Sequence, residues 1–283
     1  MWTRCLTSLA VAFALVACDE EKGHNEQREI LATDAPRALA VIRQDLDDGM
    51  TGVRAAAERL APGFAVEDPA RREADLRAGL RLVQRPTRQR VPELMTLPIT
   101  FLAAVGMDGK VIARDATEDR MRGFDLAEIA PVVQAALDGS AGHALSRIPS
   151  LLEDDPPSVT VLFAAPVRHE GQVVGALVAG LPLWRMTQQL SRQLQLEDAE
   201  EVRNGEIVWA LLLEGDTQHF HAGFPPDLRE LIPGPPARRA GLERSAGGFT
   251  GEVQQYGRWY GFGVIPVPTV GEDVTLILFR SEP

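Results

Sequence analysis

The sequence has little cysteine and almost no lysine. Its 283 residues include two cysteines, Cys5 and Cys18, and two lysines, Lys22 and Lys110. Because both cysteines lie near the start, the rest of the chain can form neither a disulfide nor a thiolate metal site. Arginine supplies most of the positive charge, and the formal net charge is −11. An acidic chain without a basic block binds nucleic acid poorly, because phosphate contacts dominate that affinity. We therefore expect no nucleic-acid partner.

The short motifs of common enzymes are also missing. The sequence contains no Gly-x-Ser-x-Gly elbow, no Walker A motif, no His-Glu-x-x-His and no Cys-x-x-Cys-His. Gly261 and Gly263 do not extend to a dinucleotide fingerprint. We predict a protein that is not an enzyme and has no cofactor. A hydrolase built on two carboxylates stays open at this point, because such residues meet only in the fold.

No apolar run is long enough to span a bilayer as a helix. The segment from Cys5 to Ala17 carries no charge, but its thirteen residues fall short of the roughly 20 that a spanning helix needs. It follows Arg4 and ends in Leu15-Val16-Ala17-Cys18. The length is typical of the apolar region of a signal peptide.

The tetrapeptide Leu15-Val16-Ala17-Cys18 resembles the lipobox of bacterial lipoproteins. The resemblance implies that residues 1–17 are a lipoprotein signal peptide and that the Cys18 thiol accepts the lipid. Residues 18–29 would then be an acidic tether. We expect an extracytoplasmic protein that is lipid-anchored to a bacterial cell membrane and faces the periplasm or the cell surface. The alternative is an ordinary secretory signal with an incidental cysteine.

Residues 30–97 are predicted to be helical. Thr33-Asp34-Ala35-Pro36 is typical of a helix start, and Pro62-Gly63 of a helix end. A second helix is expected from Asp68-Pro69 to just before Pro86. Apolar residues three and four apart form one stripe on the first helix: Leu39, Ile42, Leu46, Met50, Val53, Ala57 and Leu60.

Residues 98–182 have the pattern of strands around a helix. A buried strand at 99–105 is followed by an Asp108-Gly109 hairpin turn and a return strand at 111–115. A helix is predicted over 126–137. Three more strands are expected at 143–148, 159–168 and 172–181, and a connecting helix within 183–204.

The same order of elements recurs in residues 205–283. Gly123-Phe124 recurs as Gly223-Phe224, and Pro166-Val167 recurs as Pro266-Val267, both at an offset of 100 residues. Two matches at one offset indicate duplication of one module. The predicted fold class is α+β, with a long N-terminal helix and two modules, each a roughly five-stranded antiparallel sheet with flanking helices.

This organisation resembles the tandem Cache sensors, a PAS-like extracellular family. The hairpin at 101–113 and the closing strand pair at 165–178 are similar to the opening and the end of such a module. The resemblance implies a membrane-distal module at 98–182, a connecting helix and a second module at 205–283. Family members usually continue into a transmembrane helix and a signalling domain, whereas this chain ends at Pro283. We therefore expect output through a separate protein partner.

The family resemblance implies a small-molecule site between the sheet and its covering helices. Arg120 and Arg147 could clamp a carboxylate in bidentate fashion. The alternative is that such residues are solvated. The first-module candidates are Arg114, Asp115, Arg120, His143 and Arg147. The amino-acid signature of one Cache subfamily is incomplete here, so that ligand class is not implied.

An aromatic stretch supplies the second-module candidates. Tyr256, Arg258 and Tyr260 alternate along a predicted strand and would share one face, which could stack a ligand ring. The alternative is that strands favour aromatic residues for packing.

Two features could hold a metal, but we predict no metal site. His219 and His221 are two apart and would share a strand face, yet a third ligand is missing. Glu153-Asp154-Asp155 is acidic but lacks the spaced oxygen ligands of a calcium loop, and is expected to be a solvated loop.

Besides the hydrolase left open above, the sequence favours two functions. The first is a membrane-anchored small-molecule sensor or solute-binding protein. The second is a non-catalytic interaction protein of the cell envelope with solidly packed modules. A pocket lined by apolar residues with two or more buried polar groups favours the first, and a filled core favours the second.

Overall fold

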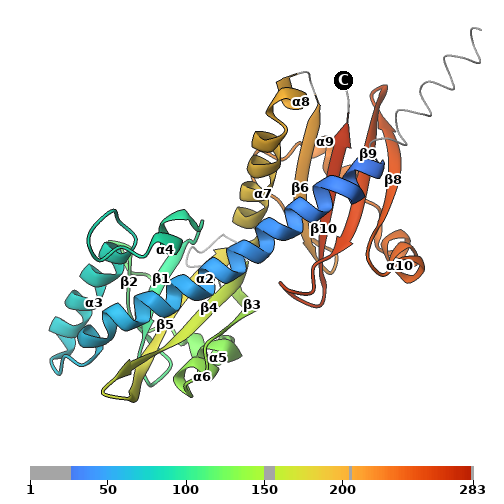
Figure 1. Cartoon of the computed structure of the whole chain (residues 1–283). Coiled ribbons are helices and arrows are strands. Elements are labelled where there is room, and N and C mark those ends of the chain that lie inside the picture. The colour runs from blue at the N-terminus through green and yellow to red at the C-terminus, as the bar shows by residue number, and fades with distance from the viewer. Residues whose placement is uncertain (1–26, 150–156, 204–205, 282–283) are drawn as a thin grey trace, which may run out of the picture. The chain divides into compact units, whose positions relative to one another are not determined.

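The computed structural model describes residues 27–149, 157–203 and 206–281. The predicted signal peptide, Cys18 and the acidic loop at 153–155 lie outside these ranges. The described chain is α+β, with a long N-terminal helix and two five-stranded antiparallel sheets (Figure 1). Within these ranges, the helices are too short or too polar to cross a membrane.

The chain divides into two compact units, each with its own sheet. The first-sheet unit consists of residues 41–186 and 269–271. The second-sheet unit consists of the described residues up to 40, together with 187–268 and 272–281.

The long N-terminal helix differs from its prediction at both ends. A π-helical turn, η1 (Ile30–Asp34), precedes α2 (Ala35–Phe64). Asp34 is therefore helical and buried rather than a cap. At the other end, α2 continues past Pro62 to Phe64. Phe64 is buried beside Gly175 of the first sheet, and this burial holds the last turn although proline removes a backbone donor.

Two shorter helices follow α2. They are α3 (Pro69–Val83) and α4 (Pro92–Thr96). Asp68 caps α3, because its carboxylate accepts a hydrogen bond from the backbone N–H of Arg71 at 2.7 Å. The cap-and-proline start predicted at Asp68-Pro69 is confirmed.

The first sheet has the strand order β2-β1-β5-β4-β3. Gly109 turns the β1–β2 hairpin with a φ of +80°, a conformation that favours glycine. The helix predicted over 126–137 is two helices, α5 (Leu126–Ile129) and α6 (Pro131–Leu137). Ala130 is extended between them, because the residue before a proline avoids the helical conformation. The strands are β1 (Phe101–Val105), β2 (Val111–Arg114), β3 (Gly142–Ile148), β4 (Ser158–His169) and β5 (Gln172–Pro182).

The second sheet has the same topology, with strand order β7-β6-β10-β9-β8. Pro166 and Pro266 lie near the ends of the equivalent strands β4 and β9. The helices before and within it are α7 (Leu183–Glu197), α8 (Ala199–Arg203), α9 (Pro226–Glu230) and α10 (Pro235–Arg244). The strands are β6 (Ile207–Glu214), β7 (Thr217–His219), β8 (Phe249–Gln255), β9 (Arg258–Pro266) and β10 (Val274–Ser281).

Helices pack on both faces of each sheet. In the first-sheet unit, α5 and α6 pack on one face and α3 packs on the other (Figure 1). Helix α2 also packs on the α3 side, where Gly49 lies against Phe163. In the second-sheet unit, α7 packs on one face, where the Ser191 hydroxyl donates to the Ala210 carbonyl at 3.2 Å. Leu228 of α9 contributes to the apolar cluster on the opposite face.

A buried ion cluster joins the first and last elements of the second-sheet unit. Arg280 at the end of β10 is only 4% exposed. Its Nη1 lies 3.3 Å from the Oδ2 atoms of both Asp34 and Asp198, and its Nη2 lies 2.8 Å from Glu206. Arg37 of α2 adds a 2.7 Å bond to Asp198. Burial raises the pKa of the Asp34 carboxyl above its ordinary 3.8, although Arg280 and Arg37 lower it.

Candidate functional site

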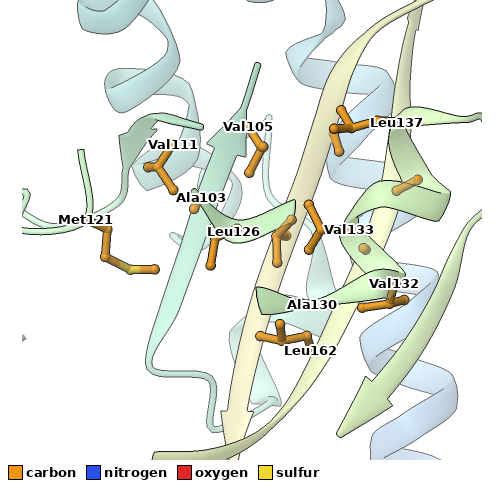
Figure 2. Packing of buried hydrophobic residues seen from close by; sticks show 14 of the residues in the cluster. Ala103, Val105, Val111, Met121, Leu126, Ala130, Val132, Val133, Leu137 and Leu162 are labelled. Atoms are coloured by element: carbon orange, nitrogen blue, oxygen red, sulfur yellow. The ribbon is translucent and has the colours of Figure 1, made fainter. Parts of the chain in front are cut away.

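The interface between the first sheet and α5–α6 is filled by apolar side chains. Figure 2 shows side chains such as Val105 of β1, Leu126 of α5 and Val133 of α6 meeting between the ribbons. The buried members are Phe101, Ala103, Val105, Val111, Met121, Leu126, Ala130, Val132, Val133, Ala136, Leu137, Ile148, Leu162, Ala164, Ala176 and Val178. Two buried polar residues share this face, because Ser146 of β3 alternates with Ile148, and Thr160 of β4 alternates with Leu162. They are paired across the two strands and carry no charge.

Two of the predicted first-module residues serve the fold. Arg114 lies at the rim of the apolar cluster, where it donates to the Thr100 carbonyl at 3.2 Å and sits 6.0 Å from the centre of the Phe101 ring. Asp115 accepts a 2.9 Å hydrogen bond from the side chain of Gln84, at the end of α3. It also accepts a 3.3 Å bond from the Leu102 backbone, so it ties α3 to β1.

The structure gives no support to a clamp between Arg120 and Arg147. Arg120 is exposed in a loop, 3.5 Å from Glu118. Arg147 alternates along β3 with Ile148, which belongs to the apolar cluster, so Arg147 points to the other face of the sheet. His143 shares that other face, because it pairs with Phe163. The two-residue period of a strand separates these side chains from α5 and α6.

The matching interface of the second sheet is aromatic and only partly covered. The chain has ten Phe, four Trp and two Tyr residues, and seven of these sixteen aromatic residues lie at this interface. We call this group the aromatic face. Phe224 and Phe279 are buried, and the other five are partly exposed. The aromatic face consists of Trp209, Phe220, Phe224, Phe249, Tyr260, Phe262 and Phe279.

Strand register and one turn assemble these rings. Phe279 of β10 pairs with Trp209 of β6 on one side and with Phe262 of β9 on the other. Phe224, which precedes α9, brings its ring centre to 5.9 Å from Trp209 and 6.4 Å from Phe279. The Phe220 ring lies 6.2 Å from that of Phe224. These spacings are typical of interacting aromatic pairs.

Two polar side chains join the aromatic face. His221 is 8% exposed and stacks on Trp209, with ring centres 5.6 Å apart. Burial lowers the pKa of this imidazole below its ordinary 6.5, so it is neutral at pH 7. Arg229 of α9 places its guanidinium 3.5 Å from the centre of the Phe220 ring and donates to the Phe224 carbonyl at 3.3 Å.

The three second-module candidates do not all lie on one strand. Tyr256 is 85% exposed and has a φ of +53°, because it lies in the turn between β8 and β9 rather than on a strand. The prediction that it shares a strand face with the other two is wrong. Arg258 and Tyr260 are both on β9, with the guanidinium 6.0 Å from the ring centre, and Tyr260 packs at the aromatic face.

The two histidines of the 217–222 region do not share a face. β7 ends at His219, which pairs with Leu212 and lies 3.8 Å from Glu214. His221 follows the strand end and stacks on Trp209, whose side chain points to the opposite face of β6 from Leu212. Within the part of the chain that the structure describes, no three His, Cys, Asp or Glu side chains form a metal site.

A cleft of about 360 Å³ lies next to the aromatic face. Leu242 lines this cleft and also packs against the aromatic face. Its lining mixes charges, with Arg238 and Arg239 against Asp216 and Glu272. Arg238 is already engaged by Asp216 and by the Pro233 carbonyl.

Sequence reasoning missed Trp209, His221 and Arg229 as parts of one site. The recurrence of Gly-Phe at 223–224 was the usable signal for this turn. Nothing local marks Arg229, because its role depends on Phe220, nine positions earlier, folding back beneath it.

No protein-family model matches the chain, and no curated protein matches it in sequence. Solved structures do match. The ligand-binding domain of the Campylobacter jejuni chemoreceptor Tlp3 in complex with L-valine is similar with a TM-score of 0.56 at 10% identity, over 95% of this chain and 96% of that one. The sensory domain of the same chemoreceptor with isoleucine bound gives 0.55 at 11% identity, with the same coverage. The chain therefore has the fold of these sensory domains.

Proposed function

We propose that this protein is a lipid-anchored, extracytoplasmic sensor or solute-binding protein that binds a small molecule and signals through a separate partner. The fold shared with chemoreceptor sensory domains over nearly the whole chain supports it. In this proposal the sheets at 98–182 and 205–283 are two PAS-like modules in tandem, joined by residues 183–204. Residues 1–17 are removed, and residues 18–29 tether the 30–97 helical region to the membrane.

The ligand site is proposed in the second-sheet unit rather than the first. The observation that carries this choice is the partly exposed aromatic face with a buried histidine. The first-sheet interface is a cluster of buried apolar side chains whose buried polar neighbours, Ser146 and Thr160, are uncharged. Partly exposed rings next to a few polar groups suit a small organic ligand. Arg258 and Tyr260 at its margin remain candidates for contact, whereas Arg114, Asp115, Arg120, His143 and Arg147 have weaker support.

A thermal-shift screen tests ligand binding directly. Full-length protein in detergent would be heated with carboxylates, amino acids, amines, nucleobases and divalent metals. A ligand that binds the native state raises the melting temperature by mass action, in proportion to the logarithm of its concentration above Kd. A dose-dependent rise with one class supports the sensor. No rise with any class contradicts small-molecule binding.

The anchor has its own test. Cell fractionation with a radiolabelled fatty acid should place the protein, labelled, in the membrane fraction. The Cys18→Ser variant should lose the label and leave that fraction, because its serine hydroxyl cannot accept the lipid through a thioether. Equal labelling of the two proteins would contradict attachment at Cys18.

The alternative, a non-catalytic envelope interaction protein, is favoured by one observation. Buried apolar side chains form a continuous cluster between the first sheet and α5–α6, and the buried polar residues on that face, Ser146 and Thr160, are uncharged. If the screen shows no shift, crosslinking in intact membranes should capture a specific protein partner.

A further inference from the structure

The aromatic face holds two buried N–H donors without an acceptor. The Nε2 atom of His221 and the Nε atom of Arg229 are both buried and lack a hydrogen-bond partner among the described residues. Buried polar groups are nearly always paired, so each exception needs an explanation such as a bound molecule. His221 precedes α9 and Arg229 lies within it. The two side chains pack on Trp209 and Phe220, whose rings both contact Phe224, so one ligand can account for both exceptions.

The proton on His221 can be placed from its surroundings. Its Nδ1 accepts a hydrogen bond from the backbone N–H of Gly223 at 3.1 Å. A neutral imidazole with an accepting Nδ1 carries its hydrogen on Nε2. The pKa of His221 is lowered by burial, so this neutral form is the one present at pH 7. His221 therefore offers a donor and not an acceptor.

Arg229 offers a donor and a positive charge. Its guanidinium is fixed over the Phe220 ring and by the bond to the Phe224 carbonyl, which leaves Nε without an acceptor. Among the described residues, Arg229 forms no ion pair with a carboxylate, and its interactions are with the Phe220 ring and the Phe224 carbonyl. A ligand cation would meet a fixed guanidinium here without an opposing negative charge, whereas an anion would gain from it.

The rings define the rest of the ligand. Trp209 and Phe220 are partly exposed and lie beside His221 and Arg229, respectively. Aromatic faces of this kind stack planar rings and cover apolar groups. The donors and the rings are joined through Phe224, whose ring contacts both Trp209 and Phe220.

We propose that the second-sheet unit binds a small organic acid with an aromatic or apolar body, whose carboxylate accepts from His221 and Arg229 while its body lies on Trp209 and Phe220. This inference rests on the proposed sensor function and names the ligand class for it.

Three probes of nearly equal shape isolate the charge. Phenylacetate, phenylacetamide and phenethylamine carry a negative, a neutral and a positive group on one ring and linker. Calorimetric titration of the full-length protein in detergent should give phenylacetate at least ten-fold tighter binding than phenylacetamide, and no measurable binding of phenethylamine. Equal affinity for the three, or tighter binding of the amine, would overturn the proposal.

Substitutions then test whether Arg229 and His221 contact the ligand. Arg229→Gln should weaken phenylacetate binding at least ten-fold, and Arg229→Lys should weaken it less because the charge stays. His221→Phe should weaken it several-fold while keeping an aromatic ring against Trp209. Arg244→Gln is the matched control, because Arg244 is exposed and bonds within α10, to Ala240. Unchanged binding in Arg229→Gln, with a native circular dichroism spectrum, contradicts the assignment.

The outcomes distinguish the ligand class from the sensor function. If the broader screen finds a ligand of another class that binds independently of Arg229, the ligand class is wrong and the sensor function stands. If no compound of any class binds the full-length protein, both fail.

Discussion

Arg280 carries a buried positive charge that is compensated by carboxylate partners. Four carboxylates lie within 4 Å of its guanidinium, those of Glu29, Asp34, Asp198 and Glu206. Removing one member of a buried ion cluster leaves the others uncompensated in a poorly hydrated place.

We expect Arg280→Met to lower the free energy of unfolding by about 3 kcal/mol. Urea unfolding followed by circular dichroism measures it. Arg192→Met on the exposed side of α7 is the control, and should change stability by less than about 0.5 kcal/mol. Equal effects of the two substitutions would mean that the buried cluster contributes nothing specific.

His221 should make stability depend on pH. Burial lowers the pKa of its imidazole in the folded protein, whereas the unfolded chain has the ordinary 6.5. Between the lowered pKa and 6.5 the unfolded state binds more protons, so stability rises with pH through this window and is lost as pH falls. Above 6.5 this contribution is constant.

Melting temperatures from pH 5 to pH 8 measure this dependence. The wild-type protein should lose more stability than His221→Gln as pH falls below 6.5. Other titrating groups, including Asp34, affect both proteins alike and cancel in the difference. Parallel curves would show that His221 keeps its ordinary protonation.

At the level of elements, the central strand of the first sheet has no room for a side chain at one position. A Cβ on Gly175 of β5 would lie 2.5 Å from the backbone carbonyl oxygen of Val105 on β1. That atom belongs to a paired strand and cannot rotate away. Gly142 of β3 differs, because a Cβ there would meet only Val132 at 3.6 Å, an ordinary contact.

We expect Gly175→Ala to destabilise the protein by about 1–3 kcal/mol, as overpacked cores do. The matched substitution Gly142→Ala should be neutral or stabilise by up to about 1 kcal/mol, because alanine loses less entropy than glycine in a strand. Chemical denaturation compares the pair. Destabilisation of the same size in both would point to a general intolerance of β-sheet glycine replacement rather than to the carbonyl contact.

Considered as a whole, the molecule has two units with separate cores. Compact units with their own cores often unfold separately, and a single two-state transition is then not expected. Differential scanning calorimetry should show two transitions. Arg280→Met should lower one of them and Gly175→Ala the other. One transition that both substitutions move together would show that the chain unfolds as a single cooperative unit.

Local patterns were enough to predict the elements. The apolar stripe on α2, the Asp108-Gly109 turn and the capped start of α3 each depend on residues a few positions apart, and they were predicted correctly. The shared offset of 100 residues predicted two copies of one module, and the structure has two five-stranded sheets with the same strand order. Element ends were less certain, because tertiary burial extends α2 past Pro62 while Pro131 divides the predicted 126–137 helix.

The buried ion cluster and the candidate site both depend on the tertiary structure. Asp34 and Arg280 of the ion cluster are in contact although 246 positions separate them in the sequence, and no local periodicity connects them. Tyr256 is not on the predicted strand face because it lies in the turn between β8 and β9. Arg147 points away from α5 and α6 because neighbouring residues of a strand point to opposite faces of the sheet. Trp209, His221 and Arg229 came together through the register of β6 and the turn before α9. Helices and strands follow from periodicity within a segment, but which side chains share a buried surface depends on how distant segments pair and which face each one turns inward.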